Sequence, residues 1–248
     1  MNNYDLYFQF IKAYEKNGFK NINRNDSLIL ELEELTSKNK QFFFIADLLK
    51  GQIIYTSKRS KDMFGLNYHN LNPYDVIEIV KPEELHRNTK GWAKLLNLAN
   101  GLFLKKEGHS ILSINMKLLN PVNEFLEILF QCFLFYSKEP LKTVYEIQIF
   151  TDLSDFKLET RGYHYYVGDD ISNFRYPDDK LLHVGISLTK REFEILQLIE
   201  SGLSTKEIAD KLFLSEYTVN AHRRNILKNT NKLHISDVIY DLLEQGLI

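Results

Sequence analysis

Three side chains near the C-terminal end of the chain are of types that can contact DNA bases. Asn220, Ala221 and Arg224 lie in the stretch EYTVNAHRRNILKN, on or near the face opposite its apolar residues. An Asn side chain can form paired hydrogen bonds with adenine and an Arg side chain with guanine, while an Ala methyl can touch thymine. Arg223 and Lys228 add positive charge that would neutralise phosphates. This stretch is therefore a candidate for insertion into a DNA groove.

Positive charge is concentrated in this part of the chain. The 248 residues include 31 Lys and Arg against 33 Asp and Glu, and the net charge of -2 predicts no general affinity for nucleic acids or anionic membranes. The segment 217–233, by contrast, has no acidic residue and contains Arg223, Arg224, Lys228 and Lys232. Because the local field governs docking in a groove, the net charge does not exclude DNA binding.

Two short helices are predicted to precede this stretch. Thr189–Glu192 has the pattern T-x-x-E and Ser204–Glu207 the pattern S-x-x-E, and each is a capping box that begins a helix. Gly202 follows the first helix where a left-handed C-terminal cap is needed, and the second helix ends around Leu212. Two helices joined by a tight turn form a helix-turn-helix, whose second helix enters DNA.

Ser215 is a suitable N-cap for the next helix, which is predicted from Glu216 to about Asn229. A last helix is predicted at about Ile235–Gln245. Apolar residues recur at helical spacing and give each helix one buried stripe, which comprises Phe193, Leu196, Ile199, Ile208, Leu212, Val219, Ile226, Leu227, Val238, Ile239, Leu242 and Leu243. The C-terminal domain is therefore predicted to be a bundle of four helices.

The last quarter of the chain resembles the DNA-binding domain of LuxR-type regulators, also called NarL/FixJ-type. The matching residues are Leu188, Thr189, Arg191, Glu192, Gly202, Lys206, Glu207, Ile208, Ala209, Leu212, Ser215, Thr218, Val219, His222 and Ile226. The resemblance implies that Asn220, Ala221 and Arg224 face DNA bases. It places near phosphates the residues Thr205, Lys206, Ser215, Tyr217, Thr218, Arg223 and Lys228.

One position departs from that family, because a basic residue is usual where this chain has Asn229. The resemblance therefore implies one phosphate contact fewer. The fourth helix resembles the one through which such domains often pair on DNA. Two alternatives stay open: a helical domain that never touches nucleic acid, and a His222 that is either a core residue or a phosphate contact.

The composition of the chain bounds its class. Its length suits two domains, and a single cysteine, Cys132, excludes a disulfide framework and is typical of a reducing compartment. The start, MNNYDLYFQF, lacks the pattern of a signal peptide, and no apolar run approaches the roughly 20 residues of a membrane span. We therefore expect a cytoplasmic protein without a membrane partner.

The part of the chain before the helical domain is predicted to combine helices with antiparallel strands. Helices are predicted at about 5–16, 27–37, 60–64, 72–80 and 82–104, and strands at about 41–46, 52–57, 110–119, 124–136 and 141–152. Poor alternation in Phe125–Phe130 predicts a strand that is apolar on both faces, one covering the core and the other a partner or the N-terminal helices.

Two strands, a helical crossover and three further strands resemble the order in PAS domains. Similar local motifs are Ile45–Asp47 in the first strand, Gly51 in the hairpin, Phe64–Gly65, and Val80–Glu84 before the long helix. The predicted class is thus α+β: a PAS-like antiparallel five-stranded sheet with helices, plus a C-terminal four-helix helix-turn-helix domain. The predicted domains are N-terminal helices (1–39), PAS-like sensor and dimerisation domain (40–155), linker (156–185) and DNA-binding domain (186–248).

The PAS resemblance implies a pocket, but the sequence identifies no cofactor. Cys132 lies in a strand rather than in the helical cysteine motif of flavin photosensors. His86 and His109 are the available haem ligands, and a surface or hydrogen-bonded histidine is the alternative for each. Trp92, Phe130 and Phe133 are the candidate lining of a ligand pocket, against the alternative of a plain apolar core.

The linker has acids, Gly and Pro throughout, yet its aromatic residues predict that it packs on one domain or across a dimer: Tyr163, Tyr165, Tyr166, Phe174 and Tyr176. In that position it would either couple the sensor to the spacing of two DNA-binding domains or serve only for docking.

These patterns predict a dimeric, sequence-specific DNA-binding transcriptional regulator whose PAS-like domain senses a small-molecule ligand or a protein partner. Its partners would be double-stranded DNA, a second copy of the chain and RNA polymerase. The alternatives are a sigma-factor-like polymerase-associated protein and a PAS-based interaction protein with weak DNA binding. We do not expect an enzyme, because the seven histidines are scattered and no Ser/His/Asp, Cys/His or metal-ligand cluster is present in the sequence.

Overall fold

The computed structural model describes residues 4–156, 164–182 and 188–248, which belong to two compact units. Unit 1 comprises Met1–Phe156 and Tyr165–Leu181, and unit 2 comprises Lys157–His164 and Leu182–Ile248. Tyr163 of the predicted linker, and residues 186–187 at the start of the predicted DNA-binding domain, lie outside the described residues.

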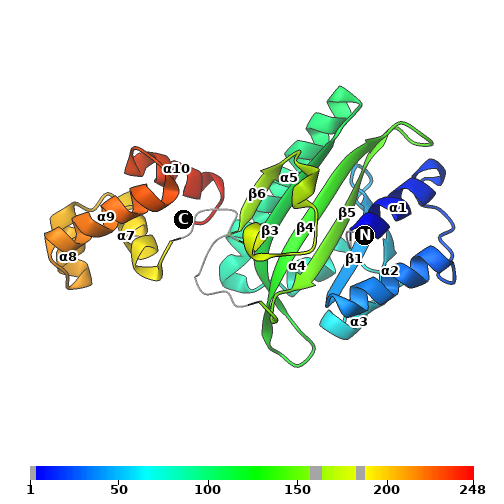
Figure 1. The fold of residues 1–248 in the computed structure, drawn as a ribbon, viewed down its shortest axis with the longest axis horizontal. Helices are drawn as coiled ribbons and strands as arrows, with labels where there is room; N and C mark the ends of the chain where they lie inside the picture. Colours follow the sequence, from blue (N-terminus) through cyan, green and yellow to red (C-terminus); the bar gives the residue numbers. More distant parts are fainter. Residues whose placement is uncertain (1–3, 157–163, 183–187) are drawn as a thin grey trace. The chain divides into compact units, whose positions relative to one another are not determined.

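Unit 1 is built on one antiparallel sheet with the strand order β2-β1-β5-β4-β3-β6 (Figure 1). The strands are β1 (Gln41–Asp47), β2 (Gln52–Thr56), β3 (His109–Leu119), β4 (Phe125–Ser137), β5 (Thr143–Asp152) and β6 (Tyr165–Gly168). The first five match the predicted strands, and their order, with helices between β2 and β3, is that of a PAS domain. The α+β prediction is confirmed, with a sixth strand that was not predicted.

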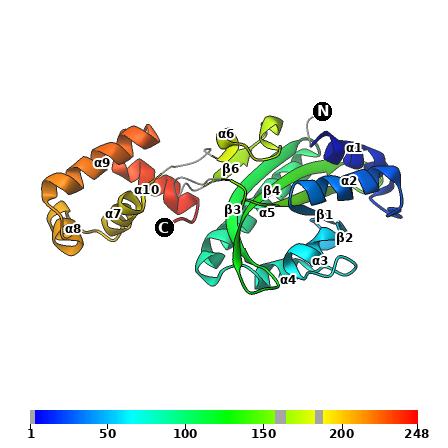
Figure 2. The same ribbon diagram turned by 60° about the horizontal axis from the view of Figure 1, so that its bottom comes forward.

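The sheet is covered on both faces by helices of unit 1 (Figure 2). One layer contains α1 (Asp5–Tyr14), η1 (Glu15–Asn17) and α2 (Ser27–Lys38). The other contains α3 (Arg59–Phe64), α4 (Pro73–Glu78), η2 (Pro82–Glu84) and α5 (Leu85–Lys105). Successive side chains of a strand point to opposite faces of the sheet. Accordingly, Phe42 of β1 packs in the core with α5, and its neighbour Phe43 packs in the core with α1.

The N-terminal helices belong to the core of unit 1. Phe10 is completely buried, and its ring lies 5.8 Å from that of Phe43 and 5.9 Å from that of Tyr55. The Tyr4 hydroxyl donates to Gln131 Oε1 at 2.8 Å and accepts from Gln41 Nε2 at 3.1 Å. Because these polar groups are buried and paired, they join α1 to β1 and β4 at little desolvation cost.

The segment predicted as a linker contributes structure to unit 1. β6 pairs with β3, with Tyr165 opposite Ile114. After η3 (Ile171–Asn173), Phe174 is buried, with its ring 5.0 Å from that of Tyr4 and 5.3 Å from that of Phe133. A short helix, α6 (Asp179–Leu182), ends this segment. Phe174, Tyr166 and Tyr176 thus complete the core that contains the N-terminal helices, whereas Tyr165 packs in the core on the other face of the sheet.

Unit 2 consists of four helices at the predicted positions, namely α7 (Lys190–Glu200), α8 (Thr205–Leu212), α9 (Glu216–Thr230) and α10 (Ile235–Glu244). Both predicted capping boxes are formed, because Glu192 N donates to Thr189 Oγ1 at 3.2 Å and Glu207 N donates to Ser204 Oγ at 3.3 Å. Gly202 has the predicted positive φ of 84°.

Among the described residues, no helix combines the length and apolar character that a membrane span requires.

We predict that Phe10→Ala destabilises unit 1 by about 3–5 kcal/mol, the usual cost of removing a fully buried phenylalanine side chain. Trp92, the single tryptophan, lies in unit 1, so its fluorescence during urea unfolding reports this unit. Leu30→Ala, at a position of α2 that is 51% exposed, is the matched control and should change the unfolding free energy by less than about 0.5 kcal/mol. Equal effects would contradict a structural role for the N-terminal layer.

Candidate nucleic-acid interface

Helix α9 is fixed to unit 2 at its start and along one side. The Ser215 hydroxyl accepts a hydrogen bond from Thr218 N at 3.1 Å and so caps the helix. Val219 and Ile226 are completely buried, each in one of the two apolar clusters of the unit. Asn231 ends the helix with a positive φ of 53°, a conformation that Asn tolerates. These contacts leave the other side of α9 free.

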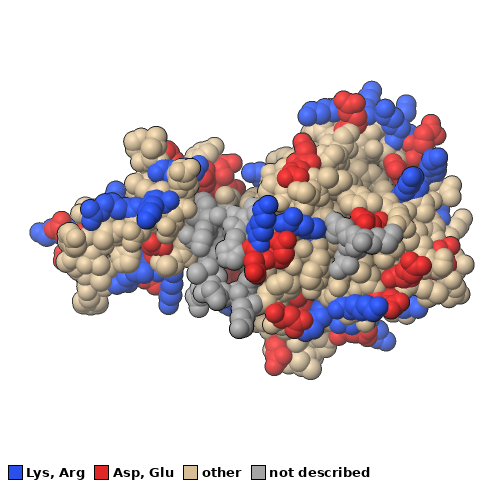
Figure 3. Space-filling view, in the orientation of Figure 1, with Lys and Arg blue, Asp and Glu red and all other residues tan. Residues whose placement is uncertain are grey.

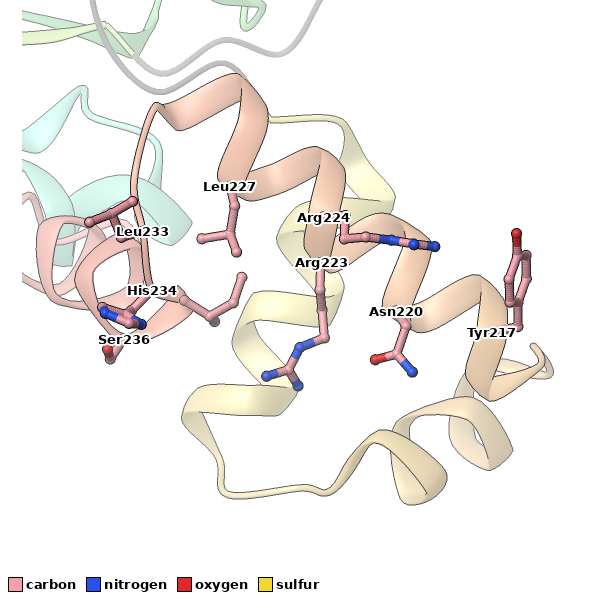
Figure 4. Close-up of a pocket in the computed structure, with 9 residues that line it drawn as sticks. Tyr217, Asn220, Arg223, Arg224, Leu227, Leu233, His234 and Ser236 are labelled. Atoms are coloured by element: carbon pink, nitrogen blue, oxygen red, sulfur yellow. The ribbon is translucent and has the colours of Figure 1, made fainter.

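The predicted base-contacting residues lie on or beside this free side. Asn220 and Arg224, one helical turn apart, are exposed, and Ala221 is half-buried. Figure 4 shows the Arg224 side chain extending from α9 on the side of the Tyr217 ring, and Arg224 Cζ lies 5.9 Å from the centre of that ring. This distance is at the outer limit of a cation–π interaction. Because Tyr217 is also 76% exposed, the contact leaves the guanidinium available.

A hollow runs beside α9, with a volume of about 750 Å³. It lies between α9, the following loop and the start of α10 (Figure 4), and its lining is Tyr217, Asn220, Arg223, Arg224, Leu227, Leu233, His234, Ile235 and Ser236. In Figure 4, the side chains of Arg223 and Asn220 extend from α9 in the same direction. The structure therefore brings together on one surface two residues predicted to contact phosphates and two predicted to contact bases. These are Tyr217 and Arg223 for the phosphates, and Asn220 and Arg224 for the bases.

The other predicted phosphate contacts lie on α8, on α9 and at the N-cap of α9. Lys206 and Lys228 are exposed, Thr205 and Thr218 are half-buried, and the hydroxyls of Ser215 and Thr218 are 2.8 Å apart. Several of these residues stand in the first turns of α8 and α9, where free backbone N–H groups favour an anion. In Figure 3, basic side chains form a row over the part of unit 2 where α9 runs. His222 is half-buried.

Two features of the turn between α8 and α9 were not predicted. Phe213 has a positive φ of 54° and is 94% exposed, although the left-handed conformation favours glycine. Arg191 Nη2 donates to Leu212 O at 2.7 Å and so satisfies a carbonyl at the end of α8. A phenylalanine gives no indication of a left-handed conformation. The position of Phe213 between two predicted helices was the one feature of the sequence that could have indicated it.

Unit 1 contains a second cavity, of about 240 Å³, between the sheet and helices α4 and α5. Trp92 lines it, as the candidate pocket required. Phe130 lies in the same core but behind Phe150, whose ring centre is 5.2 Å away and which does line the cavity. Phe133 faces the opposite side of the sheet, where it packs against Phe8 and Phe174, and it is not part of the lining.

Neither candidate haem ligand lines this cavity. His86 is exposed on α5. His109 Nε2 lies 3.0 Å from Asp169 O, and its ring stacks on Phe133, on the far side of the sheet. Among the described residues, no group of three or more His, Cys, Asp or Glu side chains could hold a metal ion.

Glu146 is one of two buried acids that line this cavity, the other being Asp47. Burial raises its pKa from 4.5 to about 7, while hydrogen bonds from Gln148 and Cys132 partly oppose the shift. The other titratable groups that face it are Asp47, which lines the cavity, and Cys132, whose own pKa burial raises well above its usual value. The lining from α4 and α5 is entirely apolar.

We predict that Glu146 makes unit 1 less stable as the pH rises from 4.5 to 8. Its folded pKa is raised, so its stabilising contribution is complete below the unfolded value of 4.5 and is lost as the pH passes about 7. A pKa shift of this size corresponds to a change of about 3 kcal/mol in the unfolding free energy. Urea unfolding followed by Trp92 fluorescence should show that the unfolding free energy of Glu146→Gln falls less than that of the wild type between pH 4.5 and 8. The same pH slope in both proteins would contradict the assignment.

Comparison with known proteins bears on unit 2. Residues 186–239 match the model of the family described as bacterial regulatory proteins, luxR family. The chain is 43% identical over 61 residues to the oxygen regulatory protein NreC of Staphylococcus carnosus, a segment that covers 25% of this chain and 28% of the relative. It is 53% identical over 45 residues to a nitrate/nitrite response regulator protein homolog of Haemophilus influenzae, covering 18% and 22%.

Solved structures cover more of the chain at lower identity. The VqmA dimer of Vibrio cholerae, solved without its target DNA, is 17% identical, covers 88% of each chain and has a TM-score of 0.40. The PAS domain of a Colwellia psychrerythraea protein is 17% identical, covers 51% of this chain and 98% of that one, and has a TM-score of 0.35.

The chain thus spans less than a third of the length of the two regulators named above. The residues that match the family model include α7, α8 and α9, with their caps and buried stripes in the predicted places. The predicted resemblance is confirmed: the C-terminal part of this chain is a helix-turn-helix domain of the luxR family of bacterial regulatory proteins.

Proposed function

We propose that the protein is a sequence-specific DNA-binding transcriptional regulator, with α9 as the helix that enters the major groove. The observation that carries this proposal is the division of α9 into two sides. Val219 and Ile226 are completely buried, whereas Asn220 and Arg224 are exposed on a surface that also holds Arg223. A luxR-family domain in unit 2 supports the same function.

Each polar side chain of this surface has a role in the proposal. Asn220, Ala221 and Arg224 contact base edges, because amide and guanidinium groups can form paired hydrogen bonds there and a methyl group can touch thymine. Residues at the flanks and at the helix starts contact phosphates and set the position of α9 in the groove: Thr205, Lys206, Ser215, Tyr217, Thr218, Arg223 and Lys228.

The regulator acts as a homodimer in this proposal. Helix α10 has Val238 and Leu242 buried against α9, while Tyr240 is 63% exposed. Large exposed apolar side chains on a short helix favour a self-complementary contact. Two paired domains would bind half-sites about one helical turn, roughly 34–36 Å, apart.

Unit 1 serves as the sensor in this proposal. The chain before the DNA-binding domain is divided by function into the N-terminal helices (1–39), the PAS-like sensor and dimerisation domain (40–155) and a linker (156–185). The cavity lined by Trp92 supports a small-molecule ligand, and a protein partner is the other source of a signal. The signal would shift the population of domain arrangements that fit the spacing of the half-sites. RNA polymerase is the expected partner downstream of DNA binding.

We predict that Arg224→Ala weakens binding to a selected operator by about 1–3 kcal/mol and relaxes base preference at the contacted position. Fluorescence anisotropy at fixed salt would compare a DNA site selected from a random pool with its shuffled sequence. Lys228→Ala should instead weaken binding to both DNAs and reduce the salt dependence by about one counterion.

Lys190→Ala is the matched charge control for both variants. Lys190 is exposed on α7, with its ammonium 4.0 Å from Glu194, and it is not among the proposed contacts. Lys190→Ala should bind the selected DNA and the shuffled DNA with affinities within about twofold of those of the wild type. Equal losses on selected and shuffled DNA in Arg224→Ala would contradict the role of Arg224 in contacting bases.

We predict that Tyr240→Arg separates dimerisation from DNA contact. Because two linked domains gain affinity from simultaneous binding, this variant should lose at least about tenfold in affinity for a full operator. Its affinity for a single half-site should stay within about twofold of the wild type, since Tyr240 points away from the core of unit 2. A similar loss on both DNAs would show that α10 is not the pairing surface.

A further inference from the structure

The cavity of unit 1 is apolar except at one end. Its walls come from α4, α5 and the sheet, and their apolar lining is Phe44, Ala46, Leu48, Pro73, Val76, Ile77, Trp92, Leu95, Leu96, Met116 and Phe150. The polar side chains that line it are Asp47, Glu146 and Gln148. Its volume of about 240 Å³ lies below the range of about 300–1,000 Å³ typical of drug-sized ligands. The cavity therefore suits a small molecule with an apolar body.

Asp47 is already paired within unit 1. Its Oδ1 accepts from Thr143 Oγ1 at 2.7 Å, and its Oδ2 lies 3.0 Å from Lys50 Nζ. Oδ2 accepts no hydrogen bond from the described residues, but the adjacent Lys50 ammonium balances the charge of this carboxylate within unit 1.

Glu146 is placed differently. Its side chain is on β5, the residue is only 5% exposed, and Oε2 accepts from Gln148 Nε2 at 2.8 Å and lies 3.5 Å from Cys132 Sγ. Within the part of the chain that the structure describes, Oε1 accepts no hydrogen bond and no Lys, Arg or His side chain lines the cavity. A buried carboxylate without a cation is costly, so this end of the cavity favours a positive partner.

Gln148 restricts the partner further. Because its amide Nε2 donates to Glu146, its Oε1 is left as an acceptor, and the described residues form no hydrogen bond to that oxygen. The polar end of the cavity thus offers two acceptor oxygens, Glu146 Oε1 and Gln148 Oε1. An anionic ligand would meet a carboxylate of the same sign, whereas an ammonium group has three donors for these acceptors.

We infer that this cavity binds a small apolar molecule that carries one protonated amine, with the ammonium donating to Glu146 and Gln148 and the apolar body packing on Trp92. This inference rests on the proposed sensory role of unit 1 and adds the chemical class of its ligand. Glu146 provides the specificity for charge, because a neutral or anionic analogue of the same shape cannot form the ion pair.

Three probes of matched size test the inference on the full chain: benzylamine, benzyl alcohol and benzoate. Calorimetry would measure the affinities, and Trp92 fluorescence would report entry into the cavity, since Trp92 is the single tryptophan and lines it. Benzylamine is expected to bind at least tenfold more tightly than benzyl alcohol, and benzoate is expected not to bind. Failure of all three probes, or equal or tighter binding of benzyl alcohol or benzoate, would overturn the inference.

Glu146→Gln keeps the shape of the side chain and removes its charge. It should weaken benzylamine binding at least tenfold and leave benzyl alcohol binding within twofold. Glu78→Gln removes the same charge from an exposed position of α4 and should change neither affinity. An unchanged affinity of Glu146→Gln for benzylamine would also overturn the inference. The probe series on the wild-type chain decides the question by itself if Glu146→Gln does not fold.

DNA binding is measured separately on the same preparation. A chain that binds operator DNA but prefers no amine refutes the inference alone. A chain that binds benzylamine in the cavity but selects no DNA sequence refutes the proposed regulatory function and leaves the ligand class standing.

Discussion

The fold of unit 1 depends on a sheet whose inner strands are buried on both faces. Every residue of β1 is buried, and so is β5 up to its last residue, so neither face can be left to water. The helices between β2 and β3 cover one face. The other is covered by α1, α2 and Phe174, which places segments from both ends of unit 1 in a single core. The N-terminal helices and the residues around Phe174 are therefore parts of the fold of unit 1 rather than appendages to it.

A second constraint shapes both candidate sites: the residues that anchor an element determine which of its side chains stay available. In α9, burial of Val219 and Ile226 leaves Asn220 and Arg224 on the free side. In β5, the pairing with β1 and β4 turns Glu146 toward helices that present only apolar groups. The first arrangement exposes groups that can bind DNA, and the second buries a charge that lacks a partner. A regulator with both would combine a DNA-binding surface with a chemically selective cavity.

The sequence predicts local features well and long-range ones poorly. The capping boxes at Thr189 and Ser204 depend on residues three positions apart, so their pattern alone located α7 and α8. The strand β6 depends on pairing with β3, more than 50 residues earlier in the sequence. Tyr and Val are common in strands, but a run of four residues does not reveal a pairing partner so far away. The sequence leaves Phe133 open between a pocket and a plain core, because a strand that is apolar on both faces has no alternation to show which side a residue faces; in the structure Phe133 packs on the side of the N-terminal helices. The approach of Glu146 to the cavity, and the left-handed turn at Phe213, likewise follow from packing that no local pattern encodes.

The proposed function requires that two α9 helices occupy adjacent major grooves of one DNA site. The most direct measurement is hydroxyl-radical footprinting of the full chain on a selected operator, combined with methylation of guanine N7, an atom exposed in the major groove. The account predicts two protected half-sites with centres about one helical turn apart on the same face of the DNA, and loss of binding when N7 is methylated in either half-site. Protection without this spacing, or binding that is insensitive to N7 methylation, would contradict it.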